Sequence, residues 1–591
     1  MNRINLASRI RSRHRPLCAG IASLLALSAP TAFASPSVWP VTSCSDSGAG
    51  SLRDVIGAVT TVSGDTVDLS GLTNCVDSKV SLSTGEIFVM QNDLTILGPG
   101  KSILAIDGTN LPGGSTNFND SRIFTHQGTG TLTVQDVRLT GGHSYHTAGG
   151  YPARGGCIYS TKNVILQSAA IEGCGATSQG DKARGGGVYA KGNVTLDDSI
   201  VSNNGVSGGD YAQGGGIWTK GTITATYSTI SGNTAYSKPK RVEGAGIYAF
   251  GGGDIVHTTI AGNAATAYTY FADGGGIYAR NDLTLSFATV TGNTVTTTSN
   301  GTCGGGAFVF GSLTVEYSTI DGNSSGGKNY LAAGGGLCVF ESLTMRRSTV
   351  SDNTTTGRAG GIMKFEICSG CNNTVSLRNS TISGNHADLV GGFYSAATHT
   401  KLYNSTIAFN TAVSGKIGSP GNYFTLSPGV AVATASDPID VAIHSMLISN
   451  NTYGASDNEN DFSVYAGKPV TFNAGPANSL IRFTLVEGLP TGIIGGCPLL
   501  GPLRDNGGLT KTHSLQSTSP AIDSGDNLPI NFITLDLYDQ RGSESDNGQG
   551  DYFRTSGPVG NPTPLPDIGA YEVQQDEIVF NSAFEGCPDI P

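Results

Sequence analysis

The stretch Gly274–Asn293, GGGIYARNDLTLSFATVTGN, contains one unit of a pattern that recurs through most of the chain. It opens with three small residues, an apolar residue and an aromatic residue, and it closes on glycine and asparagine. Between these ends, apolar and polar residues alternate from Leu283 to Phe287, which is typical of a half-buried strand. The triplets end at positions 157, 187, 216, 246, 276, 306 and 336. A step of about 30 residues is therefore maintained over many units, and it predicts a repeat protein.

Each unit predicts three short strands and three turns, which is about the length of chain that one coil of a parallel β-helix needs. We therefore expect an all-β fold, a right-handed single-stranded parallel β-helix of the pectate-lyase-like solenoid type. The right-handed winding follows the usual preference of crossover connections. Glycine allows tight corners and the close approach of the next coil. The segments between each asparagine and the next triplet vary most, and we predict them as loops: 234–243, 264–273, 294–303 and 324–333.

Asparagine closes most units at the same place, and its side chain tolerates the left-handed backbone of a corner. In stacked coils these amides would hydrogen-bond along the axis as a structural ladder, formed by Asn233, Asn263, Asn293, Asn323 and Asn353. A column of aromatic residues follows the triplets in the same way: Tyr159, Tyr189, Trp218, Tyr248, Tyr278 and Phe308. Such a column serves either as a platform for sugar rings or as a structural stack. Its fixed place in the unit favours the structural interpretation.

The first 34 residues are typical of a secretory signal peptide. Five arginines precede an apolar run from Leu17 to Ala29, and Ala32-Phe33-Ala34 has the small residues of a cleavage site. We expect cleavage after Ala34, export, and a mature chain at the extracellular or outer-membrane surface without a transmembrane segment. Removal of the five arginines moves the formal net charge from −11 to −16. Such an acidic chain argues against nucleic acid as a partner.

Ten of the 11 cysteines lie beyond the signal peptide, and an even number in an exported chain predicts disulfides. The pairs that we predict are Cys44–Cys75, Cys157–Cys174, Cys303–Cys338, Cys368–Cys371 and Cys497–Cys587. Sequence alone leaves this connectivity open, and a redox role of the Cys368–Cys371 pair is an alternative.

The repeats resemble those of the polymorphic outer-membrane proteins and of β-helical adhesins, with Gly391-Gly392-Phe393 and Phe409-Asn410 as a close match. The segment from Cys44 to Ile56 resembles the opening of exported β-helix proteins, so residues 35–125 are expected to form an N-terminal cap and the first strands. Coils of about 30 residues then occupy 126–496. Residues 497–575 resemble a choice-of-anchor domain, which implies that they close the rod and present the tail, 576–591.

The resemblance to adhesins and the variable segments together predict a secreted or surface-exposed binding protein. Aromatic residues are frequent in those segments, and the candidate ligand-binding residues are Tyr236, Tyr268, Tyr270, Phe271 and Tyr330. With basic residues beside them, they suit a polysaccharide or a cell-surface glycan through stacking and charge-assisted hydrogen bonds. Solvated loops without a ligand are the alternative for the same residues.

A polysaccharide lyase, hydrolase or epimerase acting on an acidic polysaccharide is the alternative function. Such an enzyme needs clustered carboxylates, or a basic residue that abstracts a proton. The sequence has no catalytic motif of these enzymes, and it offers only a weak candidate set: Lys238, Lys240, Arg241, Glu243 and Asp273. We expect no cofactor and no metal site. Calcium suits the acidic surface, but the glycine-rich calcium repeat is missing. The chain is expected to be a monomer.

Overall fold

The structure is a computed structural model. It describes residues 36–58, 64–111, 118–147, 150–328, 332–366, 373–414, 416–419, 422–434, 438–454, 460–466, 470–472, 479–482, 493–525, 538–542 and 565–574. Within these ranges, no helix has the length and apolar character needed to span a bilayer.

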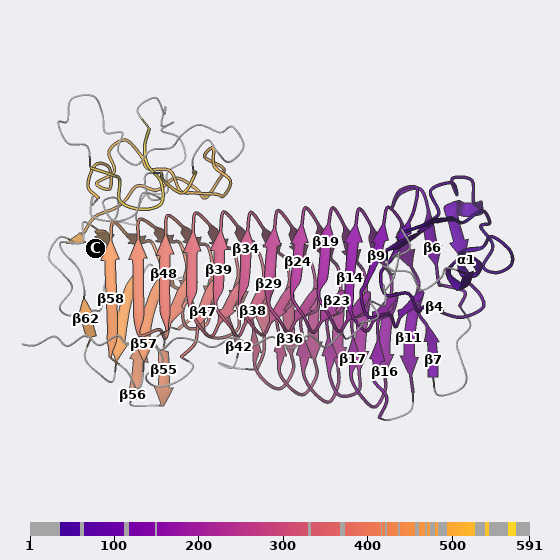
Figure 1. Ribbon diagram of the computed structural model, residues 1–591. Helices are drawn as coiled ribbons and strands as arrows, with labels where there is room; N and C mark the ends of the chain where they lie inside the picture. The colour runs from indigo at the N-terminus through magenta and orange to yellow at the C-terminus, as the bar shows by residue number, and fades with distance from the viewer. Residues whose placement is uncertain are drawn as a thin grey trace, which may run out of the picture.

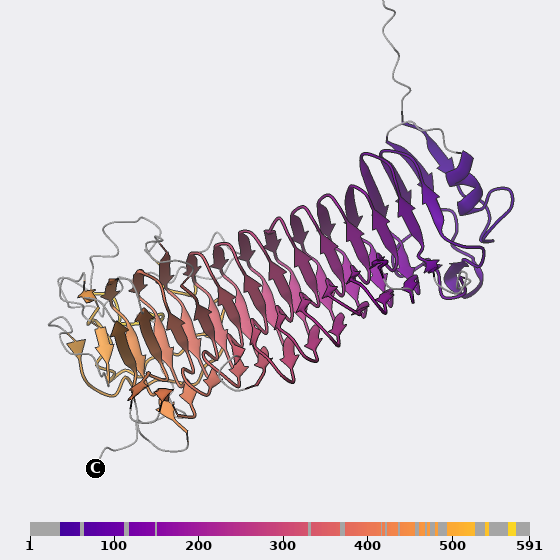
Figure 2. The same ribbon diagram turned by 90° about the horizontal axis from the view of Figure 1, so that it is seen from below.

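The chain winds into a long rod of stacked coils (Figures 1 and 2). A central coil contains five strands in succession: β23 (Ile217–Thr219), β24 (Ile223–Thr226), β25 (Thr229–Ser231), β26 (Thr234–Ser237) and β27 (Val242–Glu243). We name the sheets to which they belong sheets I to V in this order. Among the described residues, these sheets contain 13, 15, 15, 12 and 7 strands, respectively. The predicted all-β parallel solenoid is confirmed, whereas its right-handed winding stays a prediction.

The register of the sheets follows directly from the repeat. In the regular coils, each strand pairs in parallel with the equivalent strand of the next coil, so that Ile230 lies beside Ile260 and Ile260 beside Val290. Ile217, Ile223 and Ile230 point inward from sheets I, II and III and are fully buried. Such equivalent residues from successive coils form one continuous apolar core. The alternation of apolar and polar residues therefore decides which side chains enter the core.

The prediction of three strands per coil was wrong, because the variable segments also form strands. Sheets IV and V pack against each other and project from the rod as a two-layered ridge, which we call the flap. Its own small core contains Ala235, Ala265 and Val295 from sheet IV and Val242 and Ala272 from sheet V. Alanines let the two layers approach closely, but they give a weak hydrophobic signal. The sequence of these segments therefore lacks the strong alternation that predicts a strand.

Buried asparagine side chains follow one corner of the rod between sheets III and IV. The Asn263 Nδ2 donates to Asn293 Oδ1 at 2.9 Å, and the Asn293 Nδ2 donates to Asn323 Oδ1 at 2.9 Å. The same contact joins Asn233 to Asn263 and Asn323 to Asn353, each at 2.9 Å. Each oxygen also accepts the backbone amide hydrogen of the preceding asparagine. The ladder therefore satisfies buried polar groups that sheet pairing leaves free at the corner.

Three of the predicted disulfides are confirmed: Cys44–Cys75, Cys157–Cys174 and Cys303–Cys338. Cys497 is also disulfide-bonded. Its predicted partner Cys587 lies outside the described residues, as do Cys368 and Cys371.

The two ends of the chain differ from the regular coils. At the N-terminal end, helix α1 (Leu52–Ala58) buries Leu52, Val55 and Ile56 in the main core (Figure 2). The C-terminal region lies along the side of the rod against sheet III (Figure 1). There, Thr381 donates to Gln540 Oε1 at 2.6 Å, and Ser383 Oγ lies 2.8 Å from His513 Nε2. Closure of the rod by the two predicted caps stays a prediction.

Candidate functional site

The outer face of the flap carries a groove of about 670 Å³. We call it the tyrosine groove and define it by six of its lining residues: Tyr145, Thr177, Ser207, Tyr236, Lys238 and Tyr268. Sequence reasoning had singled out Tyr236 and Tyr268 as ligand-binding and Lys238 as a catalytic candidate. The structure brings these three together in this groove.

The groove exists because two small residues lie between two tyrosines in one column of sheet IV. Tyr145 pairs with Thr177, Thr177 with Ser207, and Ser207 with Tyr236, each one coil further along the rod. The two tyrosines are therefore three strand spacings apart, or about 14 Å. Thr177 and Ser207 form the floor between them, and Gly208 and Gly209 keep the adjoining edge of the flap low. Sequence reasoning missed Tyr145, because only the register aligns it with Tyr236.

Several contacts fix the walls of the tyrosine groove. Gln179 Nε2 donates to the Tyr145 hydroxyl oxygen at 2.8 Å. Thr269 Oγ1 lies 2.9 Å from the carbonyl oxygens of both Lys238 and Pro239, and Lys238 Nζ lies 5.9 Å from the centre of the Tyr268 ring. In contrast, the Thr177 and Ser207 hydroxyls and the Tyr236 side chain form no contact of this kind with other described residues. Free hydroxyls and a free aromatic ring therefore face the same space.

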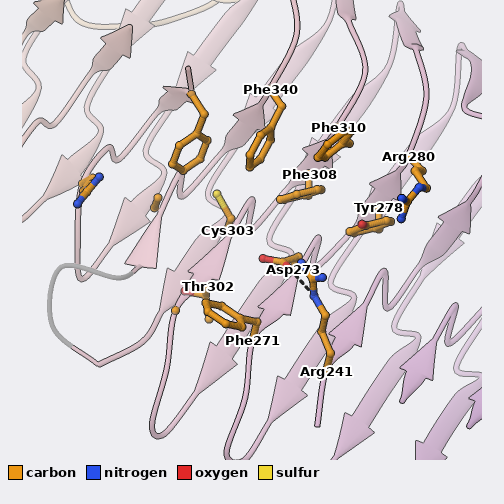
Figure 3. Close-up of a pocket in the computed structure, with 14 residues that line it drawn as sticks. Arg241, Phe271, Asp273, Tyr278, Arg280, Thr302, Cys303, Phe308, Phe310 and Phe340 are labelled. Carbon is orange, nitrogen blue, oxygen red and sulfur yellow. Dashed lines mark hydrogen bonds and ion pairs between the residues drawn. The ribbon is translucent and has the colours of Figure 1, made fainter. Parts of the chain in front are cut away.

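The inner face of the flap borders a second hollow, of about 510 Å³, between sheets V and I (Figure 3). We call it the aromatic cleft. Tyr278, Phe308, Phe310 and Phe340 line it from sheet I and from the corner after it, and Phe271 lies at its other side. Its flap side contains Arg241, Asp273 and Cys303. The Cys303–Cys338 disulfide joins the flap to sheet I at this point.

Three of the candidate catalytic residues meet at the aromatic cleft. Arg241 Nη2 lies 2.6 Å from Asp273 Oδ2, and Arg241 Nε lies 3.2 Å from Glu243 Oε1. Glu243 also accepts a hydrogen bond from Gln213 Nε2 at 2.5 Å. The buried carboxylates of Asp273 and Glu243 thus both form ion pairs with the guanidinium of Arg241. Burial raises the pKa of Asp273 to about 6, although Arg241 opposes the shift.

The other two candidate catalytic residues lie elsewhere. Lys240 Nζ pairs with Asp210 Oδ1 at 2.5 Å, and Lys238 belongs to the tyrosine groove. The five residues therefore do not form one accessible cluster. Asp273 is only 4% exposed, and its Oδ2 atom is bound by Arg241. This arrangement suits an ion pair that attaches the turn of one coil to the next.

The aromatic column next to the cleft is a structural stack. Successive rings from Tyr159 to Phe308 lie 4.5–5.8 Å apart, and their planes are within 5° of parallel. Tyr189 and Tyr278 are each only 3% exposed. Because each ring face is covered by the next ring, the column has no free face for a sugar.

The remaining sequence candidates fall into two groups. Tyr270 and Phe271 form an edge-to-face pair at 5.1 Å, and Tyr330 lies outside the described residues. In the C-terminal region, Asp539 and Arg541 form a fully buried ion pair at 2.8 Å, and the Asp539 Oδ2 also accepts the Glu572 amide hydrogen at 2.9 Å. These acidic and basic residues hold the C-terminal region together.

No group of three or more His, Cys, Asp or Glu side chains is arranged to hold a metal ion in the described part of the chain. No family model, curated protein or solved structure matches this chain. The resemblance to adhesin repeats and to a choice-of-anchor domain therefore stays an expectation from sequence.

Proposed function

We propose that the protein is an exported, adhesin-like glycan-binding protein and that the tyrosine groove holds a short segment of the glycan. The observation that supports this proposal is the combination of Tyr145 and Tyr236 at the two sides of a floor with free hydroxyls. Sugars present apolar C–H faces that stack on aromatic rings, and hydroxyl groups that exchange hydrogen bonds with Thr and Ser.

The exposure of the residues in the groove fits such a ligand. Tyr236 and Tyr268 are 43% and 48% exposed, which is high for large aromatic side chains. Lys238 provides a cationic donor at one edge of the groove, where it can meet a sugar hydroxyl or a carboxylate. The parallel sheets beneath the groove hold the backbone of these residues in register, so binding costs little conformational entropy.

Isothermal titration calorimetry with neutral hexasaccharides tests this function. The ligands are cellohexaose, maltohexaose, laminarihexaose, mannohexaose and xylohexaose. We expect at least one of them to bind, and Tyr236→Ala to weaken its binding about fivefold, because one stacking surface is lost.

A second variant blocks the tyrosine groove without removing a tyrosine. Ser207→Trp fills the floor and is expected to abolish binding. Thr296→Trp is the matched control, because it places the same side chain on an exposed position of the same column outside the groove. Absence of binding to all five neutral sugars, or unchanged binding to Ser207→Trp, would contradict the proposal.

A further inference from the structure

A second surface lies on the corner that follows sheet I, away from the tyrosine groove. The residue directly after each strand of sheet I points outward there, over five successive coils. These residues are Lys191, Lys220, Phe250, Arg280 and Phe310, and we call them the cation–phenylalanine stripe. The Arg280 amide donates to the Ala249 carbonyl at 3.0 Å and the Phe310 amide to the Ala279 carbonyl at 2.9 Å, which keeps the stripe in register. It is four strand spacings long, or about 19 Å.

The stripe contains only cations and phenylalanines, although the chain has a formal net charge of −11. All five side chains are exposed. The side chains of Lys191, Lys220 and Arg280 form no ion pair and no hydrogen bond with any described residue. The acidic residue closest to Arg280 in sequence, Asp282, accepts the Ser312 amide hydrogen at 2.8 Å instead. Three cations are therefore available to an external anion.

Aromatic rings hold the Arg280 side chain in place. Its guanidinium carbon lies 5.5 Å from the centre of the Phe250 ring and 5.9 Å from that of Phe310. Phe310 in turn stacks on Phe340, with ring centres 5.3 Å apart and planes 20° from parallel. Figure 3 shows Arg280, Phe310 and Phe340 in a row along the rim of the aromatic cleft. A guanidinium held between two rings keeps its N–H groups free for two parallel hydrogen bonds to a carboxylate or sulfate.

Four of the five members of the stripe are followed by glycine: Gly192, Gly221, Gly251 and Gly311. These glycines are required by the packing of the coils. A Cβ atom on Gly251 would lie 2.6 Å from the backbone of Gly221, and one on Gly311 would lie 2.5 Å from the backbone of Asn281. The glycines thus let the backbones of successive coils stack closely at the corner that carries the stripe.

We propose that the cation–phenylalanine stripe binds an acidic polysaccharide that runs parallel to the axis of the rod. One sugar residue of an extended pyranose chain is about as long as one strand spacing of 4.8 Å, so each coil meets one residue. Stacking of the rings along the rod turns their edges outward, and ring edges carry the positive part of the aromatic quadrupole. A row of ring edges and free cations therefore attracts a linear anion.

The same geometry favours a polysaccharide over single-stranded nucleic acid. Nucleobases bind by stacking on free ring faces. The faces of Phe250 and Phe310 that look toward Arg280 are covered by its guanidinium, and the other face of Phe310 is covered by Phe340. Glu341 and Glu366 follow Phe340 and Phe365, so acidic residues begin where the stripe ends and limit the length of any bound anion. This site is independent of the tyrosine groove, and it would give the protein a second glycan with different chemistry.

Calorimetry of the full mature chain with hexagalacturonate and a heparin hexasaccharide tests the stripe. We expect at least one of the two to bind, with an affinity that falls steeply as NaCl is raised. Arg280→Gln should weaken this binding about tenfold, because charge-assisted hydrogen bonds are lost. Arg280→Lys should recover only part of it, because an ammonium cannot donate two parallel hydrogen bonds. Lys401→Gln is the matched control, since Lys401 is exposed and unpaired among the described residues but lies on sheet II.

The outcomes separate this proposal from the proposed function. Arg280→Gln should leave neutral hexasaccharide binding unchanged, and Ser207→Trp should leave acidic hexasaccharide binding unchanged. The stripe proposal fails if neither acidic sugar binds, or if Ser207→Trp abolishes that binding while Arg280→Gln does not. It also fails if a 12-residue oligothymidylate binds more tightly than both sugars in an Arg280-dependent manner.

Discussion

Lys364 donates a hydrogen bond from its Nζ atom to the Phe340 carbonyl oxygen at 2.8 Å, inside the rod. Its side chain is fully buried, and Nζ also donates to the Phe365 carbonyl oxygen. Lys364 stands in the inward position of sheet I that Val339 occupies one coil earlier. A cation thus replaces an apolar core residue and binds the backbone at the corner that carries Phe340 and Phe365.

This buried lysine predicts a specific dependence of stability on pH. Burial lowers the pKa of Lys364 from 10.5 to about 8. The folded state therefore loses this proton before the unfolded state does, and the Lys364 contribution to stability rises with pH from about 8 to about 10.5. Lys364→Met should abolish this rise and should stabilise the protein at pH 7 by roughly 1–3 kcal/mol.

The measurement is the urea midpoint at pH 7.5, 8.5 and 9.5. Higher pH is avoided, because burial raises the pKa of Tyr248 to about 12 and adds a change of opposite sign above pH 10. Lys401→Met, at an exposed position, is the control. An equal rise with pH in wild type and Lys364→Met would contradict this account.

Asp273 predicts a dependence of stability on pH that is opposite to that of Lys364 and that occurs at acidic pH. Its pKa is raised from 3.8 to about 6, so the folded state binds this proton more tightly than the unfolded state. The stability that this proton confers is complete below pH 3.8 and is lost as the pH rises through 6. Asp273→Asn should flatten the melting temperature between pH 4 and 6.5. Asp254→Asn, an exposed carboxylate without an ion pair among the described residues, should leave the profile unchanged.

The asparagine ladder predicts that truncation of one asparagine side chain lowers the stability of the fold strongly. Asn293→Ala removes the oxygen that accepts both the Asn263 amide hydrogen at 3.0 Å and the Asn263 Nδ2 at 2.9 Å. It also removes the donor to the Ile260 carbonyl oxygen at 2.9 Å. Several buried groups lose their partners, so we expect a loss of about 3 kcal/mol. Hydrogen exchange of the neighbouring coils measures this effect, with the exposed Asn281→Ala as control. Equal exchange in both variants would be inconsistent with a structural ladder.

The Cys303–Cys338 disulfide predicts local rather than global stabilisation. It closes a loop with a sequence separation of 35 residues and joins the flap to sheet I. In a repeat protein, each coil mainly contacts its neighbours. The double variant Cys303→Ala, Cys338→Ala should therefore speed proteolysis between residues 300 and 340 and leave the distant coils protected. Limited proteolysis followed by mass spectrometry tests this, and uniform cleavage along the rod would refute it.

The main features of the rod could be predicted from sequence, because one residue type returns at one place in every unit. Ile230 and Asn233 each take the environment that their recurrence predicts. The flap could not be predicted in the same way, since residues such as Ala235 carry too little hydrophobic signal. The pairing of Cys303 with Cys338 was correct, and the two residues flank the triplets of two successive coils: Cys303 precedes Gly304–Gly306 and Cys338 follows Gly334–Gly336.

The two proposed binding surfaces could be predicted only in part, for a reason that differs from that for the flap. Tyr236 and Lys238 were found because they lie in a variable segment. Tyr145 and Ser207 were missed, because their relation to Tyr236 depends on a register that spans three coils. The cation–phenylalanine stripe also depends on the register of several coils and was missed for the same reason. Lys220 and Arg280 are 60 residues apart and form no motif, yet both follow a strand of sheet I.

In the proposed complex with an acidic polysaccharide, the parallel register fixes the spacing between successive contacts along the rod. Each coil adds one position to the cation–phenylalanine stripe and moves it by one strand spacing of about 4.8 Å. Duplication of one whole unit at an end of the stripe would therefore add one position to it and leave the existing positions in register. In the binding that we propose, the number of coils in the stripe would set the length of the bound segment, and that number can change without any change in the chemistry of an existing side chain.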